Sequence, residues 1–224
     1  MSLQKNAQQI KCKGVADIVF CFDCTGSMTE IIDSVKENVE ELVKGFGENN
    51  VILDWRARVM GYRDFDVDDE YLINDRPFVS TKEELKEQID GMNALEGSGG
   101  DDPESTLDAI WYAAKKSPWR SNCHKVVVVF TDAAAKSVNE KTLADVSGSD
   151  GDLDVLIQEL NVQHIKLFLW GMKDPMYDAM KTIPRADICQ FENPEEEYKH
   201  LDFSKLMTTI GKTVSDIATS GTEA

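Results

Sequence analysis

The amino-acid sequence contains no long apolar run. The uninterrupted stretch from Val126 to Phe130 has five residues, far fewer than the roughly 20 that a membrane-spanning helix needs. The N-terminal segment MSLQKNAQQIKCK lacks the apolar core of a signal peptide. We therefore expect a soluble protein with no membrane span.

Cysteine is also scarce. The chain has an odd number of cysteines without framework spacing, namely Cys12, Cys21, Cys24, Cys123 and Cys189. This pattern argues against a disulfide-stapled secreted fold and favours a reducing compartment, so we expect a cytoplasmic protein. The close pair Cys21-x-x-Cys24 falls in a predicted strand and has no partners at zinc-ligand spacing.

Basic residues are outnumbered by acidic ones. The chain has 24 Lys and Arg residues against 41 Asp and Glu residues, which gives a formal net charge of −17. Such a surface repels phosphate backbones, so nucleic acid is not an expected partner. Part of the surplus lies in segments 64–70 and 192–197. Solvated loops and helix starts account for most such runs, and cations or a basic partner are the alternative.

The rest of the composition is that of a globular protein. Apolar residues make up 42% of the 224-residue chain and charged residues 29%, which is enough to bury a core without disulfides or metal. We expect one domain over residues 14–218, with an N-terminal tail (1–13) and a C-terminal tail (219–224).

Strand and helix patterns alternate along the chain. Strands are predicted at 15–22, 55–62, 126–130, 165–170 and 186–191, with a weaker edge-strand signal at 71–79. Helices are predicted at 28–46, 81–92, 103–114, 153–162, 175–183 and 193–217. Segments 15–22 and 126–130 are nearly continuous apolar runs, which are typical of strands buried on both faces. The alternation predicts an α/β fold with a doubly wound, mostly parallel sheet and helices on both faces.

Local signals mark several helix starts. Ser27-x-x-Glu30 has the form of a capping box, and Thr81 is a predicted cap. Pro103 is expected at the first position of its helix, and Asn193-Pro194 is expected to open one long final helix.

Oxygen-bearing side chains follow the central strands and precede one helix. They are Asp23, Thr25 and Ser27 after the first strand, Asp101 or Glu104 in the loop before the helix at 103, and Asp132 after the Val-rich strand. Ligands of a doubly wound sheet bind beyond the carboxyl ends of its strands, so we expect these groups to converge. Hydroxyls and carboxylates suit a small hard cation, and Mg²⁺ fits best, with Mn²⁺ or Ca²⁺ as alternatives.

These residues resemble the von Willebrand factor A domain family, whose metal-ion-dependent adhesion site begins with Asp-x-Ser/Thr-x-Ser after the first strand. The segment Asp23-Cys-Thr25-Gly-Ser27 is similar to that motif, and Asp132 is similar to the family's last metal residue. The resemblance covers about residues 14–218 and implies a Rossmann-like fold. It also implies a binding module in which an Asp or Glu carboxylate of a partner protein completes the metal site.

The middle loop departs from much of the family. Many members have Gly-Thr where this chain has Asp101, and the stretch Gly99-Gly-Asp101-Asp-Pro-Glu104 is similar instead to members with Gly-Gly-Asp-x-Pro-Glu and to integrin β subunits. The third ligand is therefore either Asp101 or Glu104. In addition, Tyr62-Arg-Asp64 resembles a branch of the family in which some members accompany atypical kinase domains.

Two other interpretations use the same residues. In the first, Ser27 only caps a helix, Asp132 only ends a strand and the Gly-rich loop is only a turn. In the second, Asp23-Cys-Thr25-Gly-Ser27 resembles the Asp-Lys-Thr-Gly-Thr loop of Mg²⁺-dependent aspartyl-phosphate enzymes, with Asp23 as the nucleophile. Cys24 replaces the lysine of that loop, and we therefore expect a binding module that is not an enzyme. The sequence leaves the oligomeric state and the partner open.

Overall fold

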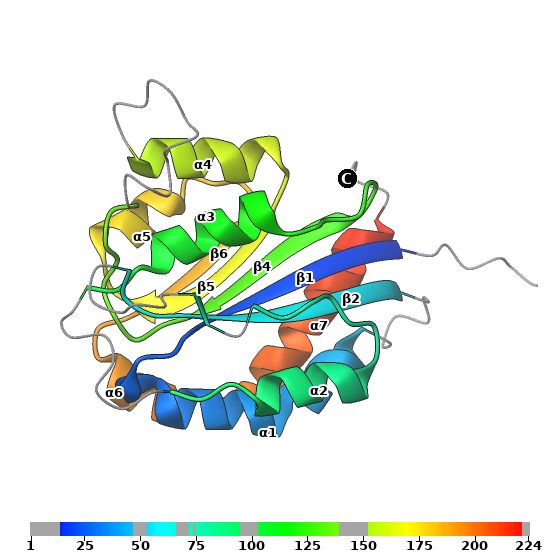
Figure 1. Ribbon diagram of the computed structural model, residues 1–224, viewed down its shortest axis with the longest axis horizontal. Coiled ribbons are helices and arrows are strands. Elements are labelled where there is room, and N and C mark those ends of the chain that lie inside the picture. The colour runs from blue at the N-terminus through cyan, green and yellow to red at the C-terminus, as the bar shows by residue number, and fades with distance from the viewer. Residues whose placement is uncertain are drawn as a thin grey trace, which may run out of the picture.

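The computed structural model describes residues 14–46, 53–65, 72–73, 75–94, 103–138 and 152–220. Strands and helices alternate along the chain (Figure 1). The strands are β1 (Gly14–Asp23), β2 (Leu53–Tyr62), β3 (Leu72–Ile73), β4 (His124–Phe130), β5 (Lys166–Met172) and β6 (Ala186–Phe191). The helices are η1 (Gly26–Met28), α1 (Thr29–Gly45), α2 (Lys82–Asp90), α3 (Thr106–Lys116), α4 (Asp152–Val162), α5 (Pro175–Met180), α6 (Pro194–Lys199) and α7 (Phe203–Thr219).

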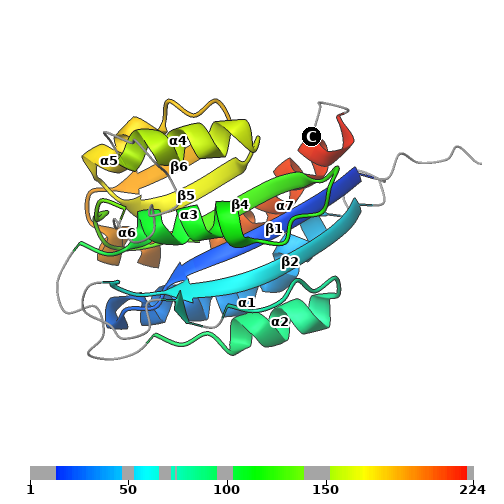
Figure 2. The same ribbon diagram turned by 45° about the horizontal axis from the view of Figure 1, so that its top comes forward.

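The strands form one sheet in the order β3-β2-β1-β4-β5-β6 (Figure 2). All neighbouring pairs are parallel except β2 with β3, which is antiparallel. The two nearly continuous apolar strands, β1 and β4, lie side by side at the centre. The predicted doubly wound, mostly parallel α/β sheet is therefore confirmed.

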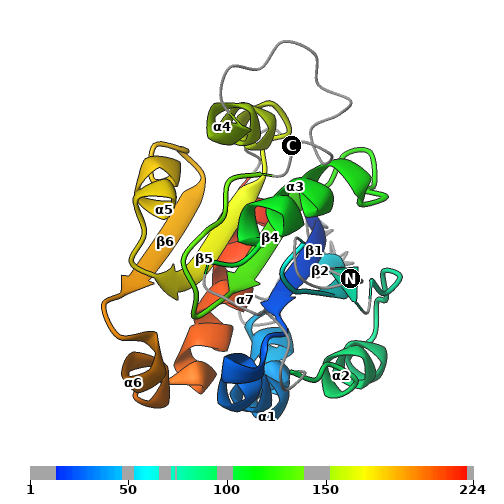
Figure 3. The same ribbon diagram turned by 60° about the vertical axis from the view of Figure 1, so that its left-hand side comes forward.

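Helices cover both faces of the sheet. Helices α1, α2, α6 and α7 lie on one side, and α3, α4 and α5 lie on the other (Figure 3). Alternate residues of β1 face opposite layers: Phe20 and Phe22 pack in the core below α1 and α7, whereas Val19 and Cys21 pack in the core below α3. This burial on both faces explains why β1 reads as a continuous apolar run.

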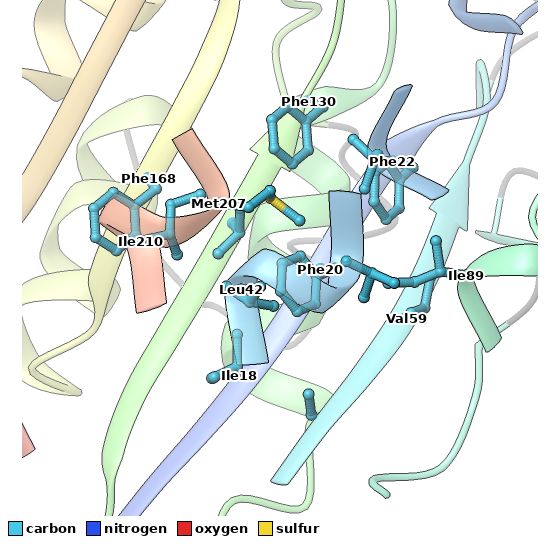
Figure 4. Packing of buried hydrophobic residues seen from close by; sticks show 14 of the residues in the cluster. Ile18, Phe20, Phe22, Leu42, Val59, Ile89, Phe130, Phe168, Met207 and Ile210 are labelled. Atoms are coloured by element: carbon cyan, nitrogen blue, oxygen red, sulfur yellow. The ribbon is translucent and has the colours of Figure 1, made fainter. Parts of the chain in front are cut away.

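An aromatic row crosses the sheet near the carboxyl ends of its central strands. Phe22, Phe130 and Trp170 are register partners on β1, β4 and β5. Their rings stack at centroid distances of 5.6 Å and 5.4 Å. Figure 4 shows Phe22 and Phe130 among the side chains of this core. The row gives the loops that follow these strands a rigid apolar base.

Helices α1 and α7 approach each other through two glycines. A Cβ added to Gly211 would lie 2.4 Å from the Leu42 carbonyl oxygen, and one added to Gly45 would lie 2.8 Å from the Thr208 carbonyl oxygen. Real Cβ atoms do not come this close to a backbone oxygen. Glycine is therefore the residue that this helix crossing requires at both positions.

A charged cluster closes the opposite end of the sheet from the β1–α1 loop. Asp17 is fully buried on β1 and accepts hydrogen bonds from Arg56 Nε at 2.9 Å and Nη2 at 2.8 Å. It also accepts from the backbone N–H and Nε of Arg120, both at 2.7 Å. Arg120 in turn contacts Asp54 at 3.0 Å. The cluster joins β1, β2 and the loop before β4.

Two sequence predictions about helix boundaries are wrong. Helix α3 begins at Thr106, so Pro103 lies outside it. The long final helix is split into α6 and α7, because Asp202 caps a new helix by accepting a hydrogen bond from the Lys205 N–H. The edge-strand signal at 71–79 is confirmed within the described residues: the short strand β3 lies at the sheet edge, antiparallel to β2, and Val79 forms a bridge with Ala57. Within the described ranges, no helix is long and apolar enough to cross a membrane.

Candidate metal-binding site

The first part of the site is the last residue of β1. Asp23 is fully buried, and its Oδ1 accepts hydrogen bonds from Thr25 Oγ1 at 2.6 Å and from the Thr25 N–H at 3.0 Å. The Cys24 N–H donates to the Tyr62 carbonyl at 2.8 Å, so the chain leaving β1 is also held by β2. Asp23 therefore anchors a loop whose conformation is set by the sheet.

Ser27 does not form the predicted capping box. It lies in the 3-10 turn η1, α1 starts only at Thr29, and neither helix start has a side-chain cap bond. Ser27 is exposed, and its Oγ lies 3.5 Å from Thr25 Oγ1. Its hydroxyl is thus placed beside the Thr25 hydroxyl and not on the helix backbone, which argues against Ser27 serving only as a cap.

The loop after β4 meets the loop after β1 at the same edge of the sheet. Thr131 Oγ1 donates to Asp23 Oδ2 at 2.9 Å, across 108 residues of sequence. The next residue, Asp132, is half-buried and lines the same concavity as Ser27. The structure thus brings together Asp23, Thr25, Ser27 and Asp132, as the sequence predicts. Sequence reasoning missed Thr131, although it directly precedes Asp132.

Glu104 lies against the β4 loop. The residue is 4% exposed, its backbone N–H donates to the Ala134 carbonyl at 2.9 Å, and its carbonyl accepts from the Lys136 N–H at 2.9 Å. The other middle-loop candidate, Asp101, lies outside the described residues. Among the residues that the structure describes, no three His, Cys, Asp or Glu side chains are grouped closely enough to hold a metal. A cation here would therefore depend on hydroxyl oxygens as well as carboxylates.

A buried ion pair that sequence reasoning missed braces the site. Asp64, just beyond β2, is fully buried, and its Oδ2 lies 2.6 Å from Lys136 Nζ on the β4 loop. Beside it, the Phe65 N–H donates to Ser105 Oγ at 2.8 Å, which ties the same segment to the start of α3. Asp64 is therefore not part of an exposed acidic surface for a basic partner. Residues 66–70 of that acidic run lie outside the described residues.

Burial controls the electrostatics of Asp23. The pKa of its carboxyl is raised to about 6, chiefly by burial and also by the neighbouring Asp132 charge, against the lowering effect of the hydrogen bonds from Thr25 and Thr131. The buried hydroxyls of Tyr62, Tyr177 and Tyr198 also lie near this carboxyl, and burial raises the pKa of each. The side chains that act most strongly on Asp23 are the hydroxyls of Thr25 and Thr131 and the carboxylate of Asp132, so a cation would relieve the cost of burying its charge.

The raised pKa of Asp23 predicts a pH-dependent stability of the metal-free protein. The folded-state value of about 6 lies above the ordinary 3.8, so the contribution to stability is present below about pH 4 and is lost as pH rises through 6. The full change is about 2–3 kcal/mol.

Urea unfolding in EDTA at pH 4, 5, 6 and 7 tests this dependence. Because other carboxylates also titrate, the informative quantity is the difference between wild type and Asp23→Asn. We expect the variant to gain stability relative to wild type as pH rises. Parallel stability curves for the two proteins would contradict the assignment.

Residues 17–209 match the model of the von Willebrand factor type A domain. The chain is 28% identical over 200 residues to a protein named alpha-protein kinase vwkA from Dictyostelium discoideum, a match that covers 83% of this chain and 31% of the kinase.

Two solved structures share the fold at low sequence identity. One is a von Willebrand factor type A protein from Catenulispora acidiphila, with a TM-score of 0.56 and 12% identity over 90% of this chain and 43% of that one. The other is proximal thread matrix protein 1 from the mussel byssus, with a TM-score of 0.56 and 16% identity over 92% and 47%. This chain spans under half of each of these proteins. Because the family model matches most of its length, the chain belongs to the von Willebrand factor type A domain family.

Proposed function

We propose that this domain is a metal-dependent protein-binding module whose Mg²⁺ is completed by an Asp or Glu carboxylate from a partner protein. Domains of this family are generally interaction modules, which supports a protein-binding role. The observation that carries the metal dependence is the convergence of the Thr25 and Ser27 hydroxyls with Asp23 and Asp132 at one edge of the sheet. Mn²⁺ or Ca²⁺ would suit the same oxygen ligands less closely.

The residues at this edge fit a hard cation. Thr25 Oγ1 gives its proton to Asp23 Oδ1, so its lone pairs remain for a ligand. The Ser27 hydroxyl is exposed beside it, and Asp132 is near enough to raise the pKa of Asp23. Neutral hydroxyls supply little charge, so a bound ion would offer an electrophilic position to an incoming carboxylate. Glu104 or Asp101 would contribute from the middle loop.

The chain's own residues set the geometry before any ligand arrives. Thr131 holds one oxygen of Asp23 and Thr25 holds the other, so this carboxylate cannot rotate. The carboxylate fixes the Thr25 hydroxyl in return. The Asp64–Lys136 pair holds the β4 loop against the end of β2. A partner therefore meets a preorganised surface, which lowers the conformational entropy lost on binding.

The test is a direct Mg²⁺ titration by calorimetry. Asp23→Ala removes the buried charge and the anchor of Thr25, and should abolish binding. Ser27→Ala removes one oxygen and should weaken binding about tenfold or more. Ser34→Ala is the matched control, because that hydroxyl lies on α1 and donates to the Glu30 carbonyl at 2.9 Å.

Circular dichroism in EDTA serves as the control for folding. The hydrophobic cores on both faces of the sheet are complete without an ion, so the far-ultraviolet spectrum should not change when metal is removed. Equal Mg²⁺ affinity for wild type and Asp23→Ala would show that the cation binds elsewhere or not at all.

The structure disfavours the aspartyl-phosphate alternative. A nucleophilic carboxylate must reach a phosphoryl group, whereas Asp23 has no exposed surface and both of its oxygens accept hydrogen bonds. We propose that the domain is not an enzyme. The kinase named among its relatives is about three times as long as the matched region, so its activity is not carried over to this chain. A phosphatase assay with beryllofluoride as inhibitor would detect the alternative chemistry.

A further inference from the structure

A pocket of about 280 Å³ opens directly beside the candidate metal site. Ser27 and Asp132 form one side of it, so the pocket and the candidate metal site share two residues. Its other walls come from α1, α6 and the start of α7, on the same side of the sheet (Figures 1 and 3). A partner group bound at the metal would therefore lie next to this pocket.

The buried residues of the pocket lining are apolar or aromatic. Ile31, Tyr198 and Phe203 contribute to it from largely buried side chains, and Leu201 is half-buried beside them. The Tyr198 hydroxyl donates to the Thr131 and Trp170 carbonyls at 3.0 Å and 2.8 Å, so its ring cannot swing outward without breaking both bonds. The pocket is thus preformed, which favours binding of a rigid apolar group.

The rim of the pocket is acidic. Glu30 and Glu195 are exposed on α1 and α6, and Asp132 adds a third carboxylate. The one cation among the lining residues, Lys199, lies 3.4 Å from Glu195 and 3.5 Å from Glu196. These carboxylates would therefore repel a second acidic side chain from a partner. A neutral apolar side chain would not be repelled and could pack against the buried apolar residues of the lining.

Building on the proposed function, we infer that this pocket binds a large apolar side chain of the same partner segment whose carboxylate completes the metal site. The partner would carry an Asp or Glu followed, one or two residues later, by Leu, Ile, Met or Phe. Successive residues of an extended segment are about 3.3 Å apart, which matches a pocket that shares its wall with the metal site. The metal would then provide affinity and the pocket would provide specificity.

Selection from a random heptapeptide phage library tests the inference without knowledge of the natural partner. Phage are bound to the wild-type domain in Mg²⁺ and eluted with EDTA. We expect the eluted peptides to share one acidic residue with an apolar residue one or two positions later. Synthetic versions of the best peptide, with and without the apolar side chain replaced by Ala, then provide the probe for titration.

Filling the pocket is the decisive change. Ser34 lines the pocket and is half-buried, so Ser34→Trp, or the smaller Ser34→Leu, places apolar bulk inside it. We expect at least tenfold weaker binding of the selected peptide but unchanged binding of its Ala version. Glu37→Trp is the matched control, because it puts the same ring on an exposed position of α1 outside the pocket lining.

The outcomes separate this inference from the proposed function. If no peptide is released by EDTA, the proposed function fails and the inference fails with it. If the EDTA-released peptides are acidic but show no apolar preference, or if Ser34→Trp and Ser34→Leu bind the selected peptide as well as wild type does, only the inference is overturned. Circular dichroism of each variant confirms that the comparison is made between folded proteins.

Discussion

Replacing Asp17 with asparagine should lower the free energy of unfolding by about 4 kcal/mol, because it removes the charge that a buried ionic cluster requires. The carboxylate is fully buried and accepts four hydrogen bonds, two from Arg56 and two from Arg120. An asparagine has one oxygen and one NH₂ group, so part of its side chain would point a donor at arginine donors.

The exposure of the two arginines limits the expected loss of stability, and the pKa of Asp17 sets the pH range in which the cluster stabilises the fold. The Arg56 and Arg120 side chains are 23% and 30% exposed, so water relieves part of the loss and the cost stays within the usual range for a broken buried pair. Burial alone would raise the pKa of Asp17, but hydrogen bonds from Arg56 and Arg120 lower it below its ordinary value. The stabilisation is therefore present above about pH 4 and is lost as pH falls below that value.

Equilibrium urea unfolding at pH 7 measures the cost of Asp17→Asn. Asp33→Asn is the matched control, since Asp33 is 61% exposed and its contact with Lys36 is a surface pair within α1. The control should change stability by no more than about 0.5 kcal/mol. A loss below about 1 kcal/mol for Asp17→Asn would mean that the cluster does not hold the three segments together.

Replacing Gly211 with alanine should cost about 3–4 kcal/mol, at or above the upper end of the usual range for overpacking. The added Cβ would lie 2.4 Å from the Leu42 carbonyl oxygen and 3.0 Å from the Gly45 Cα. Both atoms belong to the backbone of α1, so no side chain can rotate away. The two helices must separate, and the apolar contacts between them are lost along with the close approach.

Gly91→Ala provides the matched control for this helix crossing. Gly91 ends α2 with φ of −78°, and the nearest neighbour of an added Cβ is the Glu87 carbonyl oxygen at 3.4 Å. Its replacement should be nearly neutral or should stabilise slightly, because alanine restricts the unfolded chain. Both thermal and urea unfolding should show that Gly211→Ala is much less stable than Gly91→Ala. Similar stabilities for the two variants would contradict the account of α1 and α7.

The fold was predictable because its main signals are local. The apolar runs of β1 and β4 and the amphipathic pattern of α1 each lie within one segment of sequence. The boundary errors have local causes as well. A capping-box pattern at Ser27 cannot distinguish a helix start from a 3-10 turn. The break before α7 depends on the cap at Asp202, a signal that was present but masked by continuous helical periodicity.

The candidate site was only partly predictable. Loop positions at strand ends brought Asp23, Ser27 and Asp132 into the prediction, because parallel strands end at one edge. The Asp64–Lys136 pair joins residues 72 positions apart and has no local pattern that sequence reasoning detects. Its existence depends on the order of β2, β1 and β4 in the sheet, which only the structure supplies.

The bond between Thr131 and Asp23 has a consequence for the order of folding events. It joins residues 108 positions apart, so it forms only after β1 and β4 have paired. Closing such a long loop costs entropy before any contact compensates for it, and parallel pairing of distant strands is intrinsically slow. In the unfolded chain, Asp132 is far from the segment Asp23–Ser27, so a cation would find only the ligands within that short segment. A cation bound at the proposed site would therefore act only after β1 and β4 have paired, lengthening the lifetime of the folded state without speeding its formation.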